Sequence, residues 1–213
     1  MAGILDILNS DLGKQIISGV SGSTGNDSSK TSSVLTMALP VLMKAMERNA
    51  STPEGAAGLM GALSGKHDGS ILDNLGGLFG GAGVDESVKQ DGAGILSHIL
   101  GSKQQGVEQV IGQKSGLDAG SVANILKVAA PLLMGVLGKQ SRENNVSDSS
   151  GLGSLLGGML GGNETANEQN FLEKILDADG DGSVIDDVAG MLLGGDKKSS
   201  GGIGNLLGGL FGK

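Results

Sequence analysis

The feature that most constrains this chain is an apolar stretch with a central proline that occurs twice. Residues 34–46 read VLTMALPVLMKAM, and residues 125–137, which lie 91 positions later, read ILKVAAPLLMGVL. Each copy is apolar on nearly every side, too long for a strand and too short to cross a bilayer, so each predicts a buried core helix. A proline inside a helix removes a backbone donor and clashes with the preceding turn. We therefore expect each helix to kink or divide at Pro40 or Pro131.

The repeat extends beyond these two stretches. Residues 3–46 and 94–137 share ten identities at the constant offset of 91, with both prolines in register, which predicts an internal duplication. Downstream, residues 68–73 (DGSILD) match residues 181–186 (DGSVID) at an offset of 113. Period-2 alternation and hairpin turn signals are missing, so we predict an all-α protein of two related helical modules joined by glycine-rich linkers.

We expect three parts along the chain. A first helical module covers residues 1–83, a second covers residues 84–195, and a glycine-rich tether with a short apolar helix covers residues 196–213. Residues 80–92 and 194–202 are rich in glycine and polar side chains, so both are predicted to be flexible. Whether the two modules share one core stays open at this point.

Composition excludes several classes of function. The net charge of -8 and the pI near 4.7 argue against nucleic-acid binding, because no basic surface is available to displace counterions from phosphates. Cysteine is absent, which excludes disulfides, thiolate metal sites and thiol nucleophiles. The start lacks the basic region of a signal peptide, and no stretch reaches about 18 unbroken apolar residues. We therefore expect a cytoplasmic protein without a transmembrane segment.

Two segments together resemble a known family. Residues 94–140 (GILSHILGSKQQGVEQVIGQKSGLDAGSVANILKVAAPLLMGVLGKQ) and residues 176–192 (LDADGDGSVIDDVAGML) look like the YidB-like bacterial proteins, a helical family without assigned activity. The resemblance is good over residues 94–192 and extends more weakly, through the repeat, over residues 3–80. It implies a small all-α bacterial protein. No catalytic residue is carried over, because the family has none assigned.

The sharpest chemical motif is an acidic loop with carboxylates at alternate positions followed by a glycine, which is the opening of an EF-hand. Val188 stands at position 12, where a bidentate glutamate belongs, so Asp186 or Asp187, at positions 10 and 11, would have to replace it in a shortened loop. Two interpretations stay open: a Ca²⁺ site, or an acidic turn in which Asp181 or Ser183 caps the next helix. The candidate metal ligands are Asp177, Asp179, Asp181, Asp186 and Asp187.

The residues do not predict an enzyme. The two histidines, His67 and His98, occupy non-equivalent positions of the repeat, and we expect a turn or surface role for them rather than a zinc site. The sequence has no Gly-x-Ser-x-Gly nucleophile elbow with a plausible histidine partner. Its glycine runs lack the preceding strand and the basic residue that a phosphate-binding loop requires.

Four segments combine leucine at helical spacing with glycine at positions where another helix can approach closely. We expect them to pack inside the protein, and self-association through the terminal copy is the alternative. Membrane binding by that copy is disfavoured, since only Lys213 supplies positive charge there. The four segments are residues 71–79 (ILDNLGGLF), 152–160 (LGSLLGGML), 184–193 (VIDDVAGMLL) and 203–211 (IGNLLGGLF).

The predicted function is a non-enzymatic structural or interaction module, and the alternative is a calcium-binding regulatory protein.

Overall fold

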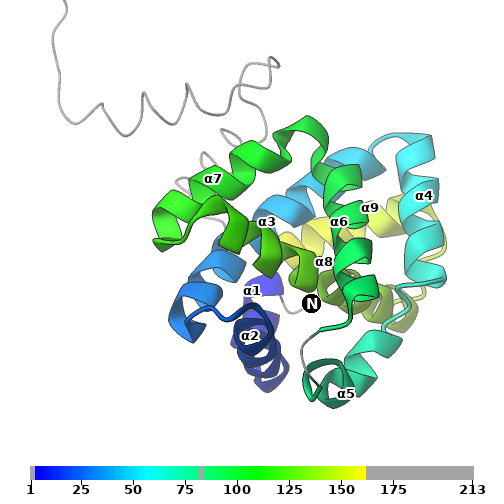
Figure 1. Ribbon diagram of the computed structural model, residues 1–213. Coiled ribbons are helices and arrows are strands. Elements are labelled where there is room, and N and C mark those ends of the chain that lie inside the picture. The colour runs from blue at the N-terminus through cyan, green and yellow to red at the C-terminus, as the bar shows by residue number, and fades with distance from the viewer. Residues whose placement is uncertain (1–2, 82–83, 162–213) are drawn as a thin grey trace, which may run out of the picture.

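The computed structural model describes residues 3–81 and 84–161. These residues form α-helices and two short 3₁₀ helices, and no strand occurs among them (Figure 1). The predicted all-α fold class is thus confirmed for the described residues. Two long helices, α3 (Ser28–Ala50) and α8 (Ala119–Glu143), pack against each other and against most of the shorter helices.

Both long helices begin where an aspartate side chain caps the backbone. Asp27 accepts from the Ser29 and Lys30 N–H groups at the start of α3, and Asp118 accepts from the Ser121 N–H at the start of α8. The other elements are α1 (Ile4–Asn9), α2 (Asp11–Thr24), α4 (Pro53–Ser64), η1 (Ser70–Asn74), α5 (Leu75–Phe79), α6 (Glu86–Leu100), η2 (Gly101–Lys103), α7 (Gln104–Ser115) and α9 (Ser149–Leu160).

Both prolines lie inside continuous helices, so the expected division of α3 and α8 does not occur. A proline in a helix interior costs about 3 kcal/mol. Leu42 and Leu133 follow the prolines by two residues and are 0% and 3% exposed. Burying a side chain of this size contributes about 1.5–3 kcal/mol, so the apolar residues on both sides of each proline offset its cost.

One apolar core runs through both halves of the described chain. Leu35 of α3 and Leu126 of α8 are both fully buried in it. Helix α9 packs on α3, α6 packs on α8, and α2 contacts both long helices. The described halves therefore share one core, which is the point that the sequence left open.

The predicted flexible linker over residues 80–92 is wrong in its second part, because α6 begins at Glu86. The Asp85 carboxylate accepts from the Ser87 N–H at 2.8 Å and caps this helix. Gly92 lies so close to the Lys127 carbonyl of α8 that a Cβ atom would collide with it. This glycine serves close helix packing rather than chain flexibility.

The predicted helix over residues 71–79 is wrong in its continuity. The described backbone forms η1 and then α5, with the interruption at Asn74, whose side chain accepts from the Gly77 N–H at 3.1 Å. An asparagine that caps its own following turn satisfies the backbone donors at this break.

The two halves share local features at the offset of 91. Gly25 ends α2 and Gly116 ends α7, each in the left-handed conformation with φ 69. A residue with a Cβ atom is strained there, which accounts for glycine at both positions. These matching features agree with the predicted duplication, which itself stays a prediction.

Helix α8 is the one described helix that is long and apolar enough to cross a membrane by length and composition. Inside this fold, 72% of its apolar window is buried. Packing in the protein core therefore accounts for its apolar character.

Candidate functional site

A cavity of about 330 Å³ lies between α4 and α6. Its floor is formed by Met46 of α3 and Met134 of α8, which are 0% and 3% exposed. We call this cavity the α4–α6 groove. It is lined by Met46, Asn49, Gly55, Gly58, Leu59, Ala62, His67, Asp91, Gly94, Ile95, His98, Ile99 and Met134.

Local signals hold the two wall helices in place. The Thr52 hydroxyl accepts from the Gly55 N–H at 3.1 Å, and Pro53 follows at the first helical position, so α4 begins at Pro53. At this end of the groove, the Asn49 side chain donates to the Ile99 carbonyl near the end of α6, at 3.2 Å. The start of α4 thus lies beside the end of α6, and the two helices run in opposite directions.

The other end of the groove is polar. Lys66 Nζ lies 2.7 Å from Asp91 Oδ1, and His67 Nε2 lies 3.7 Å from Asp91 Oδ2. His67 is 7% exposed, and its backbone N–H donates to the Ala62 carbonyl at 2.9 Å. Burial lowers the pKa of His67 below its usual 6.5, although the Asp91 carboxylate acts in the opposite direction. His67 is therefore neutral at pH 7, and the charges at this end belong to Lys66 and Asp91.

Two glycines leave open space in the walls. At Gly58 of α4 and at Gly94 of α6, no atom lies within 4 Å of the place where a Cβ atom would stand. Gly55 differs, because a Cβ atom there would collide with the Asn49 carbonyl, so close packing accounts for that glycine. The open positions let a second backbone approach the groove from either wall.

The groove is suited to binding apolar groups. Its floor is apolar and its charged side chains are confined to one end, so an apolar ligand loses its contact with water without burying a charge. His67, Asp91 and His98 line the same groove, yet within the described part of the chain no three histidine or acidic side chains are placed to hold a metal ion.

The histidine prediction is correct in part. His67 lies in the turn between α4 and η1, as expected, but it is buried, while His98 is exposed on α6. That both line one groove is not readable from the sequence, because they come from different halves of the chain. The spacing of Asp91, Ile95 and His98 along one helical face is the signal that was available. The predicted metal ligands, Asp177, Asp179, Asp181, Asp186 and Asp187, lie outside the described residues.

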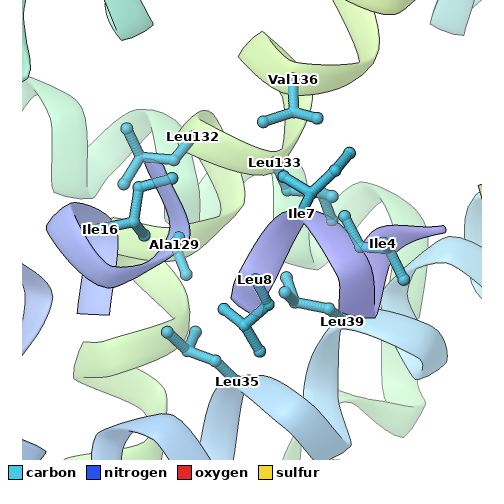
Figure 2. A pocket seen from close by; sticks show the side chains of 11 residues that line it. Ile4, Ile7, Leu8, Ile16, Leu35, Leu39, Ala129, Leu132, Leu133 and Val136 are labelled. Atoms are coloured by element: carbon cyan, nitrogen blue, oxygen red, sulfur yellow. The ribbon is translucent and has the colours of Figure 1, made fainter. Parts of the chain in front are cut away.

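A second cavity is a packing void. It measures about 30 Å³ and lies among α1, α2, α3 and α8, where Figure 2 shows aliphatic side chains on every side. This volume is close to that of about one water molecule, but such a water would find no polar side chain to bind. Its lining residues are Ile4, Ile7, Leu8, Gly13, Ile16, Leu35, Leu39, Ala129, Leu132, Leu133 and Val136.

The fold and the groove define an all-α protein built on two proline-containing core helices. Residues 6–140 match the family described as "Bacterial protein of unknown function (DUF937)", and the chain belongs to this family. All residues that line the α4–α6 groove fall within the matched range. No curated protein and no solved structure matches the chain.

Proposed function

We propose that this protein is a non-enzymatic interaction module that binds an apolar helical segment in the α4–α6 groove. The observation that carries the proposal is the combination of a methionine floor with open glycines in both walls. Methionine is flexible and polarisable, so Met46 and Met134 adapt to side chains of different shape. Gly58 and Gly94 admit the backbone of a helix, and helix-in-groove binding needs both properties.

The expected affinity is modest. Gly55 and Ala62 lie seven positions apart on the α4 wall, which is about 10 Å at 1.5 Å per residue. A groove of this length accepts two or three large apolar side chains, each contributing about 1.5–3 kcal/mol on burial. Binding also restricts the motion of the segment and of the groove side chains, and this loss of entropy opposes the gain from burial. Affinities weaker than about 1 μM, which corresponds to about 8.2 kcal/mol, are therefore expected.

Binding is tested with N-phenyl-1-naphthylamine, an uncharged apolar dye that avoids repulsion by the acidic protein. The chain has no Trp or Tyr, so dye fluorescence is read without protein background. Gly58→Leu fills the groove and should abolish dye binding. Gly61→Leu is the matched control, since Gly61 lies on α4 with no atom near its Cβ position and does not line the groove. Equal dye binding by the Gly58→Leu and Gly61→Leu proteins would contradict the proposal.

A second candidate function is calcium-dependent regulation. The observation that favours it is the Asp-x-Asp-x-Asp-Gly sequence that begins at Asp177. Melting of the full chain is followed by circular dichroism in EDTA and in rising Ca²⁺. At a hundredfold excess over its dissociation constant, an ion that binds only the folded state adds about 2.7 kcal/mol. This gain should vanish in Asp179→Ala/Asp181→Ala, and superimposed curves for the unmutated chain would exclude the site.

We also propose that the chain is YidB-like and arose by internal duplication. The resemblance of residues 94–192 supports the first statement. The capping pair Asp27 and Asp118 supports the second, as does the glycine pair Gly25 and Gly116. Family members whose two halves stay alignable at a constant offset would support the duplication, and members whose halves share no more identity than unrelated helical segments would contradict it.

A further inference from the structure

One five-residue sequence occurs twice in this chain. Residues 75–79 read LGGLF and form α5, and residues 207–211 also read LGGLF. In the described copy Leu75 is buried, and the Phe79 ring covers Gly19 of α2 so closely that a Cβ atom there would collide with the ring. This sequence therefore packs by placing a leucine in a core and a phenylalanine over a glycine of another helix.

A related sequence also buries its first leucine. Residues 156–160 of α9 read LGGML, and Leu156 and Met159 are both fully buried. Helix α9 packs on α3 and α4, and its two adjacent glycines, Gly157 and Gly158, are exposed. In both segments the first leucine is buried and the paired glycines are exposed.

We propose that residues 203–211 of the same chain occupy the α4–α6 groove. This inference rests on the proposed function of the groove and names its occupant. The segment carries no charged residue, and its leucines and phenylalanine suit the methionine floor. Phe79 packs over Gly19 because glycine has no side chain to block the ring. Gly58 and Gly94 offer uncovered glycines of the same kind in the groove walls.

The connecting chain is long enough to bring this segment to the groove. Residues 161–202 separate the end of α9 from the segment. For comparison of lengths, a random coil of about 42 residues has a root-mean-square span of about 35 Å, whereas a domain of about 160 residues has a radius of gyration of about 15 Å. A tether of this kind gives an effective concentration in the millimolar range, which favours the segment of the same chain over that of a second copy.

The placement is tested by paramagnetic broadening in the full chain. Because the chain lacks cysteine, Lys213→Cys provides a single site for a nitroxide label. We expect the label to broaden the amide signals of Gly58 and Gly94 and the methyl signal of Met134. The amide of Gly19 on α2 should keep its intensity.

Three outcomes would overturn the inference. Unchanged signals at Gly58 and Gly94 would show that the segment does not reach the groove. Broadening at Gly19 instead would show that the segment replaces α5. A mixed sample contains nitroxide-labelled chains without isotope and isotope-enriched chains without nitroxide. Broadening in this sample would show that a second copy supplies the segment.

The dye assay separates this inference from the proposed function. A segment with a dissociation constant of about 0.1 mM at an effective concentration of about 1 mM weakens dye binding about tenfold. Leu207→Asp/Phe211→Asp should therefore raise dye affinity about tenfold. Unchanged affinity in this variant, with binding still lost in Gly58→Leu, contradicts the inference alone. Absence of groove-dependent binding in every variant contradicts the proposed function as well.

Discussion

The backbone carbonyl of His67 packs directly on Gly138 of α8 and leaves no room there for a Cβ atom. This contact joins the turn at the polar end of the groove to the core helix. Because the obstacle is backbone, it does not move aside as a flexible side chain would.

The first prediction follows from this contact. Gly138→Ala should destabilise the protein by about 1–3 kcal/mol, because overpacking costs more than the helix propensity gained. Gly157→Ala is the matched control, since Gly157 lies in α9 with open space around its Cβ position. It should be neutral or stabilising by up to about 1 kcal/mol. Urea unfolding followed by circular dichroism measures both, and equal effects of the two substitutions would contradict the packing argument.

The second prediction concerns pH. The pKa of His67 is lowered in the fold, chiefly by burial, from 6.5. Below pH 6.5 the unfolded chain therefore binds more protons at His67 than the folded chain does. The stability contributed by neutral His67 is full above that pH and is lost as the pH falls toward the folded pKa.

The measurement for this prediction is the urea midpoint at pH 7.5 and pH 5.5. His67→Gln should reduce the loss of stability between these pH values. His98→Gln should retain that loss, because His98 is exposed on the groove rim. A loss of stability that is identical in all three proteins would exclude His67 as its source.

The third prediction tests the contact between Gly19 and Phe79 with a double-mutant cycle. Gly19→Ala alone should destabilise the protein, because its methyl group collides with the Phe79 ring. In a Phe79→Ala background the same change should be neutral or stabilising by up to about 1 kcal/mol, since alanine is the better helix former. Additive free energies of unfolding would show that the two residues do not interact.

The fourth prediction concerns the cap that positions the first wall of the groove. Thr52→Ala removes the acceptor for the Gly55 N–H and should cost about 1 kcal/mol of unfolding free energy. Thr36→Ala is the control. The Thr36 hydroxyl donates to the Ser32 carbonyl inside α3 and caps nothing. Its loss should be neutral or slightly stabilising, and a cost equal to that of Thr52→Ala would contradict the capping role.

Much of the helix layout could be predicted because its signals act over one turn. Asp27 and Thr52 satisfy backbone donors within three residues, so helix starts are readable without knowledge of the partners. The continuity of α3 through Pro40 could not be read in this way. It depends on apolar contacts with helices distant in sequence, which outweigh the local cost of the proline.

The groove could not be predicted for a related reason. Gly92 is the last residue of the predicted linker and Gly94 follows two positions later, yet in α6 the two positions are rotated by about 200° about the helix axis, onto different faces. Gly92 faces the Lys127 carbonyl of α8, and Gly94 faces open space in the groove.

The sequence by itself determined the all-α class, the caps and the two buried proline-containing stretches, because these depend on local hydrogen bonding and on the periodicity of apolar residues. The tertiary structure alone decided that both halves share one core and that His67 is buried beside Asp91. It also decided which glycines pack and which leave a groove. These properties depend on which faces of distant helices meet, and burial between such faces is a property of their arrangement in space.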